Sequence, residues 1–170
     1  MDQRRLTSDE FRNVIGHFAS GVTVITAVHD ERPYGTTASA VTSLSLEPPM
    51  MLVCLDRESQ TGGVIAEEGR FAVNILGEDQ ADLAVRFATK APDKFDGVAT
   101  TRGEYGEPLL ADALATLECR VVEQTTGGTH VVFFGEVERG SARAGAPLAY
   151  YRGQFGRLQL AASELDSPPS

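Results

Sequence analysis

The chain has 170 residues, of which 42% are hydrophobic and 23% are charged, and its formal net charge is -9. This length and composition suit one globular domain with its own core. The negative charge argues against nucleic acid as the main partner, because proteins bind that polyanion through clustered Lys and Arg side chains. No apolar stretch approaches the roughly 20 residues of a bilayer-spanning helix, so we expect no membrane anchor and no signal peptide.

The Cys and His residues do not form a metal-binding pattern. Cys54 and Cys119 each lie in an apolar run, which predicts two buried thiols in a reducing cytoplasm, although a disulfide stays open. His17, His29 and His130 are too scattered to indicate a metal cluster. No two glycines are separated by a single residue, so the glycine fingerprint of a Rossmann dinucleotide site is absent.

Three helices are predicted. Thr7 and Glu10 form the pattern of a capping box, and four apolar residues at helical spacing follow before Gly21 ends the pattern. Two further helices are predicted over residues 61–68 and 80–89, each with an apolar face or a polar cap.

Short β-rich runs make up most of the remaining chain. They cover residues 22–27, 36–41, 50–55, 71–76, 115–123 and 130–139, with a turn over residues 30–33. Long helices do not alternate regularly with these runs, which favours a closed antiparallel barrel over a doubly wound parallel sheet. We therefore expect a mostly β domain over residues 7–160 and a disordered tail over residues 161–170.

Residues 35–49 are the first candidate for a binding site. This run places six hydroxyl side chains among small residues and ends in a double proline. Small residues let a flat ligand approach the backbone, and hydroxyl and N–H groups can hydrogen-bond the edge of a heteroaromatic ring. An edge strand with a polar solvent face explains the same composition, and composition alone somewhat favours it.

Ser59 and Thr61 stand at the start of the second predicted helix. The first N–H groups of a helix are unpaired and partly positive, which suits a phosphate. Simple helix capping by either hydroxyl is the more common use of such residues and needs no ligand. The two uses are compatible.

Three cations and an aromatic residue form a local positive patch near the third predicted helix. The patch consists of Arg86, Lys90, Lys94 and Phe95, and it includes both lysines of the chain. An anionic cofactor would need such a patch. A solvated helix end, whose cations complement the helix dipole, accounts for it equally well.

Two further segments can be explained either as parts of a binding site or as purely structural elements. His130 lies where a loop enters a strand, a place that often lines a pocket, although a lone His is more often structural. The run Tyr150-Tyr151-Arg152-Gly153 can stack on a ring or bind a phosphate, and it is as readily explained by core and cation–π packing.

Taken in order, these segments resemble the flavin reductase-like, FMN-binding split-barrel family, whose short-chain members serve two-component monooxygenases. The resemblance spans roughly residues 11–158, and it lies in the order of the motifs rather than in any single one. The motifs cover residues 19–24, 35–49, 59–61, 71–76, 94–95, 135–137 and 151–153. The resemblance implies a six-stranded antiparallel split β-barrel with a few peripheral helices, and a homodimer with flavin near the interface.

The resemblance also implies site residues. Those against the isoalloxazine ring are Thr37, Ala38, Ser39 and Ala40. Those near the ribityl or phosphate portion are Ser43, Ser45, Ser59, Thr61 and Lys94. Further cofactor contacts are implied for Thr36, Cys54, Leu55, Asp56 and Phe95. Those on the nicotinamide side are His130, Tyr151, Arg152 and Gly153.

The implied activity is reduction of FMN or FAD by NADH or NADPH, with the reduced flavin supplied to a partner oxygenase. His130 is the candidate catalytic residue, but Thr129 stands where the family usually has Asp, which weakens a role as proton donor. Hydride transfer needs the two rings stacked at about 3–3.5 Å and no obligatory acid. A flavin storage or sensing protein, and a flavoenzyme acting directly on an organic substrate, remain alternatives, and a barrel without flavin is the least favoured.

Overall fold

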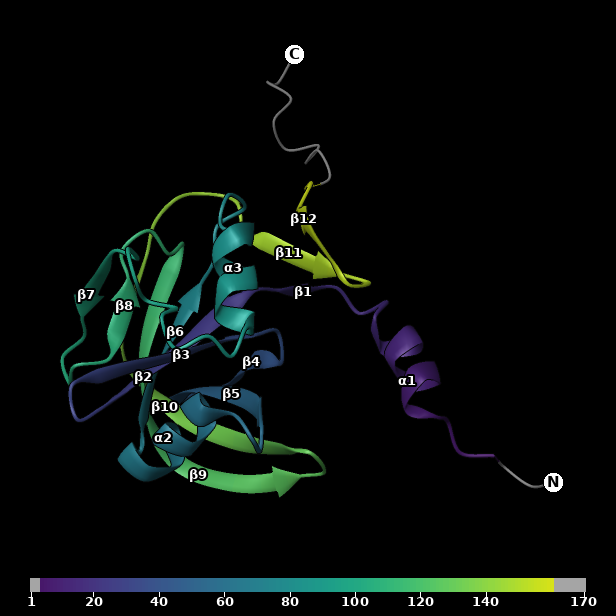
Figure 1. Cartoon of the computed structure of the whole chain (residues 1–170), viewed down its shortest axis with the longest axis horizontal. Helices are drawn as coiled ribbons and strands as arrows, with labels where there is room; N and C mark the ends of the chain where they lie inside the picture. Colours follow the sequence, from purple (N-terminus) through teal and green to yellow (C-terminus); the bar gives the residue numbers. More distant parts are fainter. Residues whose placement is uncertain (1–3, 161–170) are drawn as a thin grey trace, which may run out of the picture.

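The computed structural model of the protein describes residues 4–160, so the predicted tail over residues 161–170 lies outside the described residues (Figure 1). Within these residues the structure has three helices beside a body of strands, and their bounds are α1 Ser8–Ile15, α2 Gln60–Glu68 and α3 Ala81–Ala88. None of these helices is long and apolar enough to cross a membrane.

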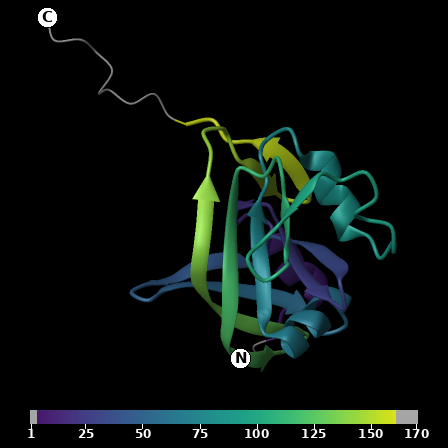
Figure 2. The same ribbon diagram turned by 90° about the vertical axis from the view of Figure 1, so that its left-hand side faces the viewer.

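Seven strands form one antiparallel sheet in the order β3-β2-β6-β9-β10-β5-β4. Their bounds are β2 Thr23–His29, β3 Arg32–Ala38, β4 Val41–Leu46, β5 Pro49–Asp56, β6 Arg70–Ile75, β9 Ala115–Gly127 and β10 His130–Ala142. The two outermost strands, β3 and β4, are consecutive in the chain and joined by two residues, so the sheet curls back on itself as a split barrel. Figure 2 shows the hairpin of β4 and β5 projecting from this body.

Five short strands lie outside the large sheet. Their bounds are β1 Ser20–Gly21, β7 Thr100–Arg102, β8 Pro108–Leu110, β11 Leu148–Tyr151 and β12 Gln154–Arg157. Strands β1, β11 and β12 form one small sheet, and β7 and β8 form a hairpin. The prediction of a mostly β split barrel is confirmed, although the large sheet has seven strands rather than six.

The predicted strand over residues 36–41 was wrong at both ends. The turn before it occupies only Asp30 and Glu31, whose φ angles of 47° and 60° form a two-residue hairpin turn. Strand β3 therefore starts at Arg32, and it can include Pro33 because an edge strand needs no N–H on its outer side. The chain turns again at residues 39–40, so Val41 begins the next strand.

Two clusters of buried side chains form the core. The first fills the barrel and includes Ile25, Ile65, Phe71 and Phe133. The second packs α3 against the outside of the barrel and includes Phe87. Burial of these apolar side chains supplies the main stabilisation of the fold.

Both cysteines are free in the structure, as the sequence predicted. Cys119 is buried and Cys54 is partly buried. Burial raises the pKa of the Cys119 thiol to about 12 and also raises the pKa of the Cys54 thiol. Both side chains therefore stay protonated at neutral pH and contribute to packing.

Helix α1 stands apart from the barrel (Figure 1). The predicted capping box is present, because the Thr7 hydroxyl accepts from the Glu10 N–H while the Glu10 carboxylate accepts from the Thr7 N–H. None of the residues of α1 is buried. Its apolar face is therefore exposed in the single chain.

Candidate functional site

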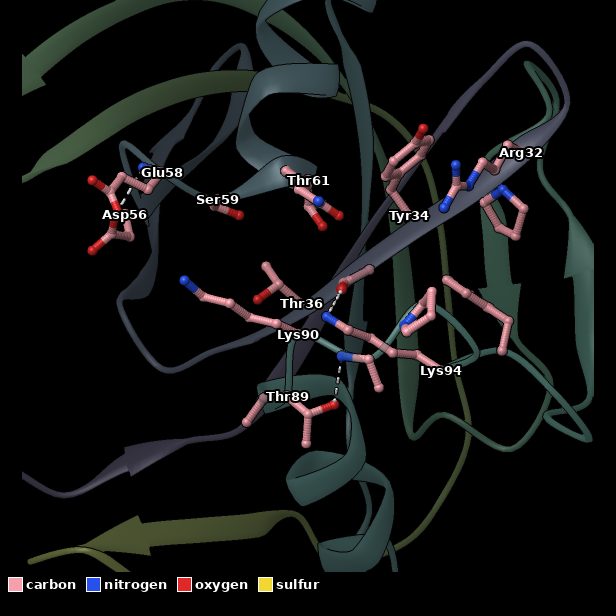
Figure 3. Close-up of a pocket in the computed structure, with 17 residues that line it drawn as sticks. Arg32, Tyr34, Thr36, Asp56, Glu58, Ser59, Thr61, Thr89, Lys90 and Lys94 are labelled. Atoms are coloured by element: carbon pink, nitrogen blue, oxygen red, sulfur yellow. Dashed lines mark hydrogen bonds between the residues drawn. The ribbon is translucent and has the colours of Figure 1, made fainter.

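Two cavities lie at the two ends of residues 36–39. The first, which we call the β3 cavity, has a volume of about 370 Å³ and lies between β3, the start of α2 and the segment after α3 (Figure 3). Thr36 lines it. The second, which we call the α1 cavity, has a volume of about 610 Å³ and is lined by Ser39 together with residues of α1 and the β11–β12 turn. Both volumes fall in the range of pockets that hold small organic ligands.

The start of α2 forms one wall of the β3 cavity. Ser59 is the N-cap, and its hydroxyl accepts a 3.2 Å hydrogen bond from the Gly62 N–H. Thr61 is only 3% exposed and lines the cavity, and its hydroxyl has no hydrogen-bond partner among residues 4–160. The N–H groups of Gln60 and Thr61 lead the helix and have no acceptor within it. This wall combines a free hydroxyl with free N–H donors, which suits a phosphate.

The two lysines at this cavity differ in what they can bind. The Lys94 Nζ donates to the Gly35 carbonyl at 2.9 Å and to the Phe87 carbonyl at 3.3 Å, and burial lowers its pKa. An ammonium group has three donors, so at most one remains for a ligand. Lys90 is exposed, and in Figure 3 its side chain extends toward Asp56 and Ser59.

Arg86 does not join the lysines at this cavity. Its guanidinium donates to the Asp93 carbonyl at 3.0 Å and to the Asp96 carbonyl at 2.5 Å, which holds the segment after α3 in place. The predicted positive patch is therefore divided. Lys90 and Lys94 face the cavity, whereas Arg86 has a structural role.

The outer side of β3 offers backbone donors. Strand β3 is an edge strand, and the Gly35 carbonyl points away from β2 because Lys94 reaches it. The N–H and C=O groups of one strand residue point the same way, so the N–H groups of Gly35 and Thr37 also face outward. The Thr37 hydroxyl is already used, since it donates to the Ala84 carbonyl at 2.6 Å. The Thr37 hydroxyl therefore has no proton left to donate to a ligand.

The tight packing of α3 on β3 depends on Gly35. A Cβ atom at this position would lie 2.6 Å from Phe87 Cε1 and 3.0 Å from Phe95 Cζ. The two aromatic rings pack edge to face with centroids 4.9 Å apart. Glycine therefore lets Phe87 pack against β3, with Phe95 beside it as a lining residue of the β3 cavity.

The α1 cavity joins the end of α1 to the β11–β12 turn. Arg152 and Gly153 form this turn with φ angles of 48° and 81°, and both line the cavity. The Arg152 N–H donates to the Gly16 carbonyl at 3.0 Å, which ties the turn to the end of α1. Tyr150 also lines the cavity.

Comparison with known proteins identifies the fold family. Residues 15–159 match the flavin reductase like domain family. The chain belongs to this family. It is 56% identical over 153 residues to the reductase component of 4-nitrophenol 4-monooxygenase/4-nitrocatechol 2-monooxygenase from Rhodococcus opacus, which covers 90% of this chain and 82% of that relative. The prediction of a flavin reductase-like protein is thereby confirmed.

Two other relatives agree with this assignment. The chain is 43% identical over 148 residues to the reductase subunit HsaB of a flavin-dependent monooxygenase from Mycobacterium tuberculosis, covering 85% of this chain and 79% of that one. The structure of the present chain superposes with a TM-score of 0.87 on that of SgcE6, an NADH:FAD oxidoreductase from Streptomyces globisporus in complex with NAD and FAD fragments. The two chains are 34% identical, and the superposition covers 94% of this chain and 100% of SgcE6.

The structure brings together about half of the site residues that the sequence suggested. The residues that line the β3 cavity are Thr36, Asp56, Ser59, Thr61, Lys94 and Phe95. The residues that line the α1 cavity are Ser39, Arg152 and Gly153. Residues 36–39 link the two groups, because Thr36 lines one cavity and Ser39 lines the other.

The other suggested residues line neither cavity. They are Thr37, Ala38, Ala40, Ser43, Ser45, Cys54, Leu55, His130 and Tyr151. Ala38 and Leu55 are buried in the core, and the Ser45 hydroxyl accepts from the Glu47 N–H at 3.2 Å in an edge strand. Tyr151 packs edge-on against His17 with ring centroids 6.2 Å apart, while its neighbour Tyr150 faces the α1 cavity.

His130 has an acidic neighbour that is distant from it in the sequence. It is paired with Asp56 across the ladder of β10 and β5, and directly opposed residues share one face of a sheet. Its Nδ1 lies 2.9 Å from the Thr129 hydroxyl, and the Asp56 carboxylate accepts from the Glu58 N–H at 2.8 Å. No ion pair joins His130 to Asp56 within the described chain.

The sequence did not suggest every residue that lines the β3 cavity. Arg32 and Tyr34 are among those that it missed. Arg32 and Tyr34 lie two apart on β3 and so share one face of the strand. The sequence did not indicate this shared strand face, because residues 30–33 have the composition of a turn.

Proposed function

We propose that this protein is a flavin reductase that passes hydride from NADH to a flavin and supplies the reduced flavin to a separate oxygenase component. The observation that carries the proposal is the pair of cavities joined by residues 36–39. Three residues of extended chain span about 10 Å. This separation suits a ligand whose planar ring and phosphate are joined by a ribityl chain.

The phosphate end of the ligand is assigned to the β3 cavity. The Thr61 hydroxyl and the first N–H groups of α2 donate to phosphate oxygens, and Lys90 adds a positive charge nearby. Lys94 holds the Gly35 carbonyl and keeps the wall of the cavity in position.

The ring end is assigned to the strand edge and the α1 cavity. The outward N–H groups of β3 donate to ring acceptors, and Ser39 is small enough for a ring to approach. Arg152 and Tyr150 form the opposite wall, where the nicotinamide would pack. Bound flavin and nicotinamide supply the electronic chemistry of hydride transfer, and the protein supplies their alignment.

His130 is assigned no proton transfer. It is exposed and lies at the β10 end beside Asp56, which itself lines the β3 cavity. Hydride transfer requires no obligatory acid from the protein, so His130 and Asp56 shape the rim of the site.

A homodimer is part of this proposal. Phe11, Val14 and Ile15 on the apolar face of α1, and Phe18 just after the helix, are between 49% and 77% exposed. A face of this kind marks a protein contact, and α1 also forms a wall of the α1 cavity. A second copy would cover α1 and complete the ring end of the site. Sedimentation should give a dimer for the natural chain and a monomer for Val14→Asp, while a Val14→Asp variant that stays dimeric would contradict this contact.

Similarity to known reductases supports a hydride donor and an acceptor, and the free thiols support a location. Similarity to an NADH:FAD oxidoreductase supports NADH as the donor. Similarity to reductase components of monooxygenases supports an oxygenase as the protein that receives the reduced flavin. The free thiols support the reducing cytoplasm as its location.

NADH oxidation by the purified protein in air tests the proposal. We expect little oxidation without added flavin and a rate that saturates as FMN or FAD is added. Tight flavin binding without NADH oxidation would instead indicate a storage or sensing protein. Oxidation that needs an organic substrate, and not free flavin, would indicate a flavoenzyme that acts on that substrate directly.

A further inference from the structure

The β3 cavity continues beyond its phosphate-binding wall. In Figure 3, Asp56, Ser59 and Lys90 lie on one side of Thr36, and Tyr34 and Arg32 lie on the other. A flavin that ends at its first phosphate would occupy the α2 wall and leave the Tyr34 side empty. This side of the cavity therefore offers room for a further part of the ligand.

The chemistry of this second side suits an adenine base. The Tyr34 ring is half-buried against the core, and the Arg32 guanidinium lies 5.3 Å from its centroid. Arg32 is exposed and makes no ion pair among residues 4–160, so its plane is free to move onto a ligand. Aromatic rings and Arg planes are the surfaces on which nucleic acid bases stack.

A second Tyr and Arg pair in the same protein lacks these properties. The Arg70 guanidinium lies 3.3 Å from the centroid of the Tyr105 ring, and it is held there by a 2.8 Å bond to the Glu138 carboxylate. That ring face is already covered, and Tyr105 lines neither the β3 cavity nor the α1 cavity. It provides a matched control.

We infer that the flavin of this protein is FAD, bound with its adenosine half on the Tyr34 and Arg32 side of the β3 cavity. The inference rests on the proposed function, because it takes the α2 wall as the site of the flavin phosphates. The flavin then runs antiparallel to β3, with its ring at Ser39, its phosphates beside Thr36 and Thr61, and its base at Tyr34. FMN would lack the contacts of the last part.

Binding titrations of FAD and FMN, followed by flavin fluorescence, test the inference on the full-length protein. We expect FAD to bind at least fivefold more tightly than FMN, at the lower end of what base stacking on an aromatic ring provides. Tyr34→Leu, which keeps an apolar side chain against the core, should remove this difference by weakening FAD and leaving FMN within twofold. Tyr105→Leu should leave both affinities unchanged.

A competition experiment separates base binding from phosphate binding. ADP should displace FAD from the natural protein, and Tyr34→Leu should weaken the ADP competition at least fivefold, whereas inorganic phosphate should compete equally in both. Equal binding of FMN and FAD, or equal loss of both in Tyr34→Leu, would overturn the inference. If FMN still supported NADH oxidation in that case, the proposed function would stand without it.

Discussion

Thr61→Val tests the phosphate end of the site. The Thr61 side chain is only 3% exposed, and its hydroxyl has no partner among residues 4–160. Valine keeps the shape of the side chain and removes one donor. A hydrogen bond to a charged group contributes about 1.5–3 kcal/mol. Each 1.4 kcal/mol changes an affinity about tenfold, so the Kd for FMN or FAD should rise about 10- to 150-fold.

Riboflavin, which has no phosphate, is the discriminating ligand for this variant. Fluorescence titrations should show that Thr61→Val weakens FMN and FAD while leaving riboflavin unchanged. The thermal midpoint should also stay unchanged, because no hydrogen bond of the free protein is lost.

Thr26→Val is the matched control. The Thr26 side chain is fully buried, and its hydroxyl donates to the Pro108 carbonyl at 2.6 Å. Its removal leaves a buried carbonyl unpaired and should lower the free energy of unfolding by about 1–3 kcal/mol. The ratio of FMN to riboflavin affinity should not change. An unchanged ratio in Thr61→Val as well would refute the placement of the phosphate at α2.

Three further substitutions test other parts of the account. Ser39→Tyr should abolish flavin binding without lowering the thermal midpoint, because the new ring would fill the place assigned to the isoalloxazine; unchanged flavin affinity would remove Ser39 from the site. Gly35→Ala should destabilise the protein, because the new Cβ would lie 2.6 Å from Phe87 Cε1; calorimetry showing an unchanged midpoint would contradict that contact. Glu107 is 2% exposed with one carboxyl oxygen unpartnered in the described chain, and burial raises its pKa. The folded state therefore holds this proton longer than the unfolded state, and stability falls as pH rises from the ordinary Glu pKa of about 4.3 through the raised value. Glu107→Gln should make the thermal midpoint less dependent on pH in this range and should raise it at higher pH. Parallel plots of thermal midpoint against pH for the two proteins would show that Glu107 does not titrate in this range.

The fold class could be predicted because it depends on local patterns. Apolar and β-branched runs gave most strands of the large sheet, and Thr7 with Glu10 gave the start of α1. The boundary between β3 and β4 was missed because the chain turns at residues 39–40 without Gly or Pro. The turn at Asp30 and Glu31 was placed too long because Pro33 is tolerated only by an edge strand, and edge position depends on the tertiary fold.

The sequence predicted only those site residues whose local motif also marks a place that the fold brings to a cavity. Ser59 and Thr61 were marked by their place before a helix, but only the structure shows that Ser59 caps it while the Thr61 hydroxyl faces a cavity. Lys94 was marked by its charge, but its bond to the Gly35 carbonyl, 59 residues away in the chain, depends on the tertiary fold. Tyr34 carried no signal, because its role depends on a cavity formed by three separate segments.

The amount of reduced flavin formed per protein molecule shows whether this protein releases flavin as a product. The protein would be mixed with excess NADH and a large excess of FAD without oxygen, and the loss of oxidised flavin would be followed by its absorbance. A diffusing flavin substrate predicts many molecules of FAD reduced for each molecule of protein. Reduction that stops at one flavin per protein molecule would contradict the account, because the flavin would then be a held group rather than a product delivered to an oxygenase.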